Sequence, residues 1–169
     1  MERCAQIDKE GGDYFFSTSE NEETIIPEWQ QKLEASGLTV LDREVPASLP
    51  EAMSAIYAAT GIDVKPTVSV RNSLPDADVQ LNQHWAAQTA AHNLTSENGA
   101  FYILTRMTGG GERAIDWIHV RDTIGSDLPY RIRAGTGNAE FLVVSEDGRV
   151  MCAVTTEESE SWIVVHRFS

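Results

Sequence analysis

The sequence is poor in cysteine, in long apolar runs and in basic residues, and each shortage excludes a class of protein. Its two cysteines, Cys4 and Cys152, lie far apart among 169 residues and can both stay reduced in a cytoplasm. No run approaches the ~20 apolar residues of a membrane span. The charged start, MERCAQIDKEGGDYFF, lacks the apolar core of a signal peptide. We therefore expect a soluble cytoplasmic protein.

Basic residues are half as numerous as acidic ones. Thirteen Lys and Arg stand against 26 Asp and Glu, for a formal net charge of −13, of which −10 falls in residues 1–100. Nucleic acids and anionic membranes need a basic footprint, so neither is expected as a partner. A basic protein would instead be steered toward this chain. Solubility alone is the alternative explanation of the acidic surface.

Three segments in the first 98 residues have helical signals, with Pro or Asp at the start and apolar residues at 3–4 spacing. They are 25–37, 48–61 and 76–94. The spacing predicts core faces formed by Trp29 and Leu33 in the first, by Met53, Ile56, Tyr57 and Thr60 in the second, and by Val79, Trp85 and Ala86 in the third. Between them, 38–45 reads as a strand, and 62–70 as an edge or irregular strand because Pro66 interrupts it.

After Gly99 the apolar period changes from 3.6 to 2. Six strand-like runs follow, at 100–107, 113–122, 130–134, 140–145, 149–155 and 161–168. Turn residues separate them, and Asp147–Gly148 is the clearest hairpin signal. The pattern predicts one α+β domain over 1–169, helix-rich in 1–98 and strand-rich in 99–169. About three N-terminal helices would cover one face of a mainly antiparallel meander of five to six C-terminal strands.

No catalytic or metal-binding set assembles from the sequence. His84 and His92 are eight residues apart, which is wrong for a zinc-binding helical pair, and no Cys–His cluster has ligand spacing. Cys152 in VMCAV resembles a small buried apolar residue rather than a nucleophile. The glycine runs TGGGE and GTGN lie between strand-like segments and read as turns rather than as phosphate loops. We expect no metal and no cofactor.

One arrangement keeps an enzyme open as an alternative. Arg131 and Arg133 are two apart in a strand-like run and would project from one sheet face, where they could clamp a carboxylate or phosphate. Together with His119 and a nearby carboxylate they would form the site of a small enzyme or toxin domain. This alternative requires these groups to converge in a pocket.

Two acidic clusters are the most distinctive local feature. Each places like charges close together in a loop, where burial is excluded and presentation to a partner is favoured. The clusters are Glu20, Glu22 and Glu23, and Glu157, Glu158 and Glu160. We expect them to contact a basic partner, with Trp29 or Trp162 as an aromatic anchor.

The segments IDWIHV, RAGTGNAEFLVVSEDGRV and SWIVVHRF, in the last 55 or so residues, resemble the sheet-rich C-terminal parts of small bacterial toxin-immunity proteins. The resemblance implies a cytoplasmic inhibitor that occludes the active site of one cognate toxin. It transfers no functional residue. An acidic secretion chaperone or other dimeric adaptor is a further alternative, which predicts a large apolar dimer surface.

Overall fold

The computed structural model describes residues 26–42, 44–105 and 116–169. Their eleven elements, in chain order, are α2 (Glu28–Ala35), β1 (Leu38–Val40), α3 (Ala52–Thr60), β2 (Val68–Arg71), α4 (Ala77–Ala91), β3 (Ala100–Thr105), β4 (Ile118–Asp122), α5 (Leu128–Thr136), β5 (Phe141–Val144), β6 (Val150–Thr156) and β7 (Glu160–Arg167). The predicted α+β class is confirmed. The predicted counts are wrong, because the described residues form four helices and seven strands.

All seven strands belong to one antiparallel sheet in the order β1-β4-β3-β5-β6-β7-β2. Of the predicted meander of five to six strands, only β5-β6-β7 pair consecutively, because β3 lies between β4 and β5. The Asp147–Gly148 turn joins β5 to β6, with Gly148 at φ +77°. Both edge strands come from the N-terminal half, which therefore contributes more than helices. β1 pairs with β4, and β2 pairs with β7 at the edge position predicted from Pro66.

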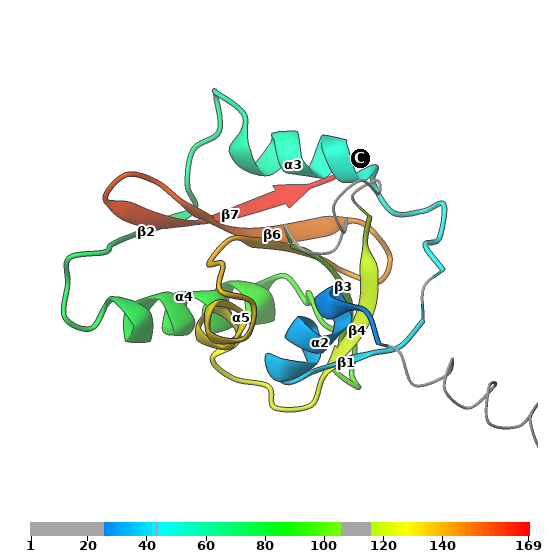
Figure 1. Cartoon of the computed structure of the whole chain (residues 1–169). Helices are drawn as coiled ribbons and strands as arrows, with labels where there is room; N and C mark the ends of the chain where they lie inside the picture. The colour runs from blue at the N-terminus through cyan, green and yellow to red at the C-terminus, as the bar shows by residue number, and fades with distance from the viewer. Residues whose placement is uncertain (1–25, 43, 106–115) are drawn as a thin grey trace, which may run out of the picture.

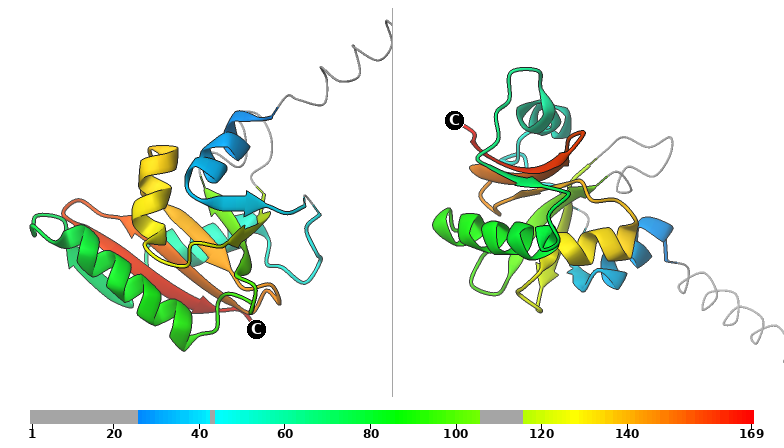
Figure 2. Two further views of the ribbon diagram at one scale, coloured as in Figure 1. Left: turned by 90° about the horizontal axis from the view of Figure 1, so that it is seen from below. Right: turned by 90° about the vertical axis from the view of Figure 1, so that its left-hand side faces the viewer.

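Helices cover both faces of the sheet, so the predicted segregation onto one face is wrong. α2, α4 and α5 lie on one side, and α3 lies alone on the other (Figures 1 and 2). The two apolar clusters confirm this division, with Leu33, Trp85 and Ile132 in one and Ala55 and Ala59 of α3 in the other. β3 is buried at every position because both of its faces are covered.

The run 130–134, predicted as a strand, is part of helix α5. Pro129 in its first turn and Gly137 in a left-handed conformation after it are ordinary helix start and stop signals. Leu128, Ile132 and Thr136 recur every four residues and are buried. The alternation of apolar and basic residues in YRIRA fitted a strand equally well, and the helical spacing becomes visible only over the longer window.

The predicted faces of two helices also need correction. α3 buries Ala52, Ala55 and Ala59 against the sheet, and it exposes Met53 (48%) and Tyr57 (68%). A side made of alanines lets a helix approach the strands closely.

α4 buries Leu81 together with the predicted Trp85, whereas Val79 is 54% exposed and Ala86 is exposed as well. In α2 the predicted core residues Trp29 and Leu33 are both buried. Among the described residues, no helix has the length and apolar character needed to cross a bilayer.

Candidate functional site

The turn between β6 and β7 exposes Glu157 and Glu158 of the second acidic cluster, as predicted, whereas Glu160 is half-buried in β7 rather than in the loop. Glu157 and Glu158 are exposed, and the Glu157 amide donates to the Glu160 carbonyl at 2.8 Å, which closes the turn. Glu160 begins β7, and its carboxylate accepts from Trp162 Nε1 at 2.9 Å and from the Ser69 hydroxyl at 2.7 Å. These two bonds, the indole first, lower the pKa of Glu160.

The other predicted partner-binding residues are placed differently. Glu20, Glu22 and Glu23 lie outside the described residues. Trp162 is half-buried on the α3 face of the sheet, beside the acidic turn. Trp29 is 8% exposed in the core beneath α2, so it offers a partner almost no surface.

An apolar stripe on α3 is the surface that the sequence prediction misplaced. We define the α3 stripe as Met53, Ile56, Tyr57 and Thr60, which follow one side of the helix. Met53 and Tyr57 are exposed and Ile56 is half-buried, and Ile62 just beyond the helix is 98% exposed. The signal that could have revealed it is the alanine spacing at 52, 55 and 59, because the helix buries that side instead.

The α3 stripe and the acidic turn meet at a cavity of about 450 Å³, here called the α3 cavity. Ile56 and Thr60 form one wall, Leu104 and Leu142 of the sheet contribute apolar surface, and Glu157 lies at the edge. Glu140 also lines the cavity and accepts from the amide and hydroxyl of Thr156 at 2.9 and 3.0 Å.

A buried hydroxyl also lines the α3 cavity. Thr155 is 2% exposed, and its Oγ1 has no hydrogen-bond partner in the described structure. This hydroxyl has almost no accessible surface, so it is closed to a molecule in the cavity. The cavity therefore combines apolar walls with a carboxylate edge.

The alternative site of His119, Arg131 and Arg133 does not come together. His119 projects from β4 toward the α3 side, because its neighbours Ile118 and Val120 belong to the core on the other side. Both arginines lie on α5, across the sheet from His119. Arg131 binds Asp122, and Arg133 binds the carboxylate of Asp78 on α4 through two bonds of 2.8 and 2.6 Å.

His119 is instead clamped between two carboxylates. Its Nδ1 lies 3.0 Å from Asp42 and its Nε2 lies 2.7 Å from Glu146, while its ring stacks on Tyr102 with centroids 4.4 Å apart. Burial alone lowers the pKa of His119, but the hydrogen bonds that its ring donates to Asp42 and Glu146 outweigh it and raise the pKa above 6.5. With both ring nitrogens engaged, this histidine ties three segments together rather than serving as an available base.

This clamp predicts a pH-dependent contribution to stability. The folded pKa of His119 is raised, so its stabilisation is fully present below the unfolded value of about 6.5 and is lost as pH rises through the folded pKa. We expect His119→Gln to lower the unfolding free energy by about 1–2 kcal/mol at pH 6 and by less at pH 9. Urea unfolding at the two pH values measures the difference.

The matched control is His84→Gln, an exposed side chain on α4 that forms no ion pair within the described residues. It should change stability by less than about 0.5 kcal/mol at both pH values. Equal losses at pH 6 and pH 9 for His119→Gln would contradict the proposed ionic clamp.

The described residues contain no group of three or more His, Cys, Asp or Glu side chains placed to hold a metal ion. Cys152 is buried in β6, and burial raises the pKa of its thiol to about 12, so the reactive thiolate is scarce at neutral pH. Cys4 lies outside the described residues.

Comparison with known proteins adds no family. Protein-family models, curated proteins and solved structures were all searched, and none of them matches this chain.

Proposed function

We propose that this protein is a non-catalytic acidic binding protein, most concretely a cytoplasmic immunity protein that occludes the active site of a cognate toxin. The observation that carries the proposal is the exposed α3 stripe, which adjoins an acidic turn through the α3 cavity in a chain of net charge −13. The partner we expect is a protein with a basic surface around its active site.

We expect the apolar and the acidic residues of this surface to contribute to binding in different ways. Tyr57 and Met53 provide apolar area that a partner can desolvate, and tyrosine is among the residues that dominate binding energy. Glu157 and Glu158 supply long-range attraction, which raises the association rate more than the affinity. The α3 cavity suits a lysine or arginine of the partner, whose aliphatic stem would pack on Ile56 while its charged end meets Glu157.

The attraction between Glu157 and Glu158 and a basic partner predicts that removing these charges changes the association rate. The partner is first captured from a lysate of the organism that carries the gene, and stopped-flow mixing then measures association. Changing Glu157 and Glu158 to Gln should slow association about threefold to tenfold at low salt and flatten its salt dependence. Changing Glu28 and Glu34 on α2 to Gln removes the same charge from the opposite side of the sheet. Equal rates for the two variants would remove the local electrostatic claim.

The apolar contact proposed for the α3 stripe predicts that the complex loses affinity when Tyr57 is replaced. Tyr57→Ser should weaken the complex by about tenfold or more, because it removes a large exposed ring from the centre of the surface. Tyr130→Ser is the matched control, since Tyr130 is 50% exposed on α5 and lies across the sheet. Calorimetry on the purified pair measures both.

Other outcomes overturn the proposal. It fails if both tyrosine variants bind alike, or if the partner keeps its activity inside the complex. It also fails if light scattering shows a dimer of this chain that Tyr57→Ser dissociates, because that result favours a dimeric adaptor.

A further inference from the structure

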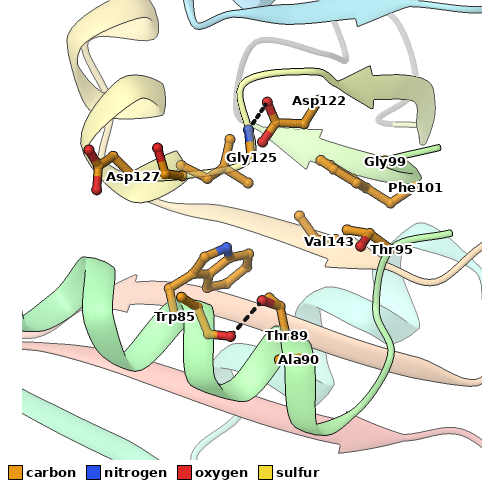
Figure 3. A pocket seen from close by; sticks show the side chains of 13 residues that line it. Trp85, Thr89, Ala90, Thr95, Gly99, Phe101, Asp122, Gly125, Asp127 and Val143 are labelled. Carbon is orange, nitrogen blue, oxygen red and sulfur yellow. Dashed lines mark hydrogen bonds between the residues drawn. The ribbon is translucent and has the colours of Figure 1, made fainter. Parts of the chain in front are cut away.

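A second cavity lies on the sheet face opposite α3, between α4 and the loop that joins β4 to α5 (Figure 3). Its volume is about 310 Å³, at the lower end of the ~300–1,000 Å³ typical of small-molecule sites. Phe101 of β3, Val143 of β5 and Leu128 of α5 give it an apolar interior. The sheet separates this cavity from the α3 stripe, so it plays no part in the proposed partner surface.

Small residues keep this cavity open at its mouth. Ala86 and Ala90 are the exposed α4 residues at its edge, and Gly125 lies opposite them on the loop. Gly125 has φ +82°, and a Cβ added there would meet no atom within 4 Å. The left-handed backbone at Gly125 favours glycine.

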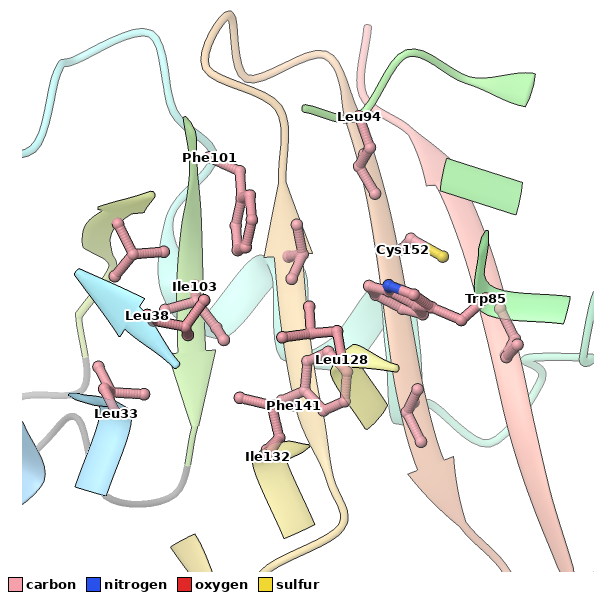
Figure 4. Close-up of a cluster of buried hydrophobic side chains, with 14 of the residues drawn as sticks. Leu33, Leu38, Trp85, Leu94, Phe101, Ile103, Leu128, Ile132, Phe141 and Cys152 are labelled. Carbon is pink, nitrogen blue, oxygen red and sulfur yellow. The ribbon is translucent and has the colours of Figure 1, made fainter. Parts of the chain in front are cut away.

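The indole of Trp85 supplies a polar group aimed into this space. Trp85 is 5% exposed and packs on Phe141 with ring centroids 5.0 Å apart (Figure 4). Its ring nitrogen is directed across the cavity toward the 125–127 segment, and no hydrogen bond joins it to another described residue (Figure 3). A buried indole usually finds an acceptor, so this donor is available to a bound molecule.

The rim of the cavity disfavours anions. Both carboxylate oxygens of Asp122 are already hydrogen-bonded, because Oδ1 accepts from the amides of Ile124 and Gly125 and Oδ2 accepts from Arg131. Asp127 is exposed at the start of α5, and the whole chain is acidic. An acidic ligand would therefore meet repulsion on entry.

From this geometry we infer that the cavity binds a small uncharged molecule of about one aromatic ring that bears a carbonyl oxygen. The ring packs on Phe101 and Val143, and the carbonyl accepts the hydrogen bond of Trp85 Nε1–H. The inference does not depend on the proposed partner, because it concerns the other side of the sheet.

Three probes of matched shape test it on the full chain by nuclear magnetic resonance of ¹⁵N-labelled protein. Benzamide carries the carbonyl, toluene lacks it, and benzoate adds a negative charge. We expect benzamide to bind with a Kd on the order of 1 mM and to shift the Trp85 indole resonance. Toluene and benzoate should each bind about tenfold more weakly, through loss of the hydrogen bond and through repulsion respectively.

Variants locate the site. Trp85→Phe keeps the aromatic packing but removes the N–H, and it should abolish the preference for benzamide over toluene. Ala90→Leu narrows the mouth and should weaken benzamide about tenfold, whereas Ala87→Leu, equally exposed on α4 but away from the cavity, should leave it within about twofold. The inference is overturned if benzamide does not bind, if toluene binds equally well, or if the two alanine variants behave alike.

Discussion

Replacing Arg131 with alanine is expected to lower the free energy of unfolding by about 3–5 kcal/mol. Its guanidinium joins three segments, donating to Asp122 at the end of β4 at 2.7 Å, to the Ser36 carbonyl after α2 at 2.8 Å, and to the Ser126 carbonyl at 2.8 Å. The side chains of Arg131 and Asp122 are only 14% and 10% exposed. Removing the Arg131 guanidinium therefore leaves the Asp122 carboxylate and the carbonyl oxygens of Ser36 and Ser126 without the donor that they share.

The matched control lies two residues further along the same helix. Arg133 forms a two-bond ion pair with Asp78, but the two side chains are 43% and 48% exposed. Arg133→Ala should therefore cost only about 0–1 kcal/mol. Urea unfolding of both variants at neutral pH measures the contrast. Similar losses would contradict the assignment of Arg131 as the residue that holds α2, β4 and α5 together.

Gly135→Ala is expected to lower the free energy of unfolding by about 1–3 kcal/mol, although alanine is the better helix former by about 1 kcal/mol. Gly135 lies in α5 where the helix meets the end of α2. A Cβ added there would stand 2.8 Å from the Ser36 amide nitrogen and 3.0 Å from its Cα, besides overlapping the Ser36 hydroxyl. Backbone atoms cannot rotate away, so the two helices must separate.

The neighbouring residue provides the control for helix propensity. Ala134 is exposed on α5, and Ala134→Gly should cost up to about 1 kcal/mol through propensity alone. Thermal or urea unfolding of both variants is the measurement. A Gly135→Ala protein as stable as the parent would show that α2 and α5 have room to move apart.

The local signals predicted most of the elements but not their orientation. Proline or aspartate at the start and apolar residues at 3–4 spacing located three helices, and five of the six predicted C-terminal strands exist. α5 was missed because YRIRA satisfies a period of 2 over five residues. Helix α3 was predicted, but its buried side was not. Its alanines and its larger apolar residues form two different sides of the helix, and either side could be buried. The distance between the helix and the sheet decides which one is, and the sequence does not contain that distance.

The candidate sites depend on contacts that no local pattern contains. His119 meets Asp42 and Glu146, which are 77 and 27 residues away along the chain. The same holds for the α3 cavity, which Ile56 and Glu157 both line although about a hundred residues separate them along the chain. The acidic turn was predictable, because its exposure follows from its loop position and its charge.

The pairing of β2 with β7 has a consequence for how the chain folds. Val68 lies opposite Ile163, so the sheet cannot be completed at this edge until a ribosome has released nearly a hundred further residues. Strands β5, β6 and β7 are joined by short turns and can pair first. β2 can pair only after β7 has formed, because its contact with β7 spans a long stretch of chain. We expect late docking of β2 to be the slow step of folding, which pulse-labelled hydrogen exchange would register as delayed amide protection at residues 68–71.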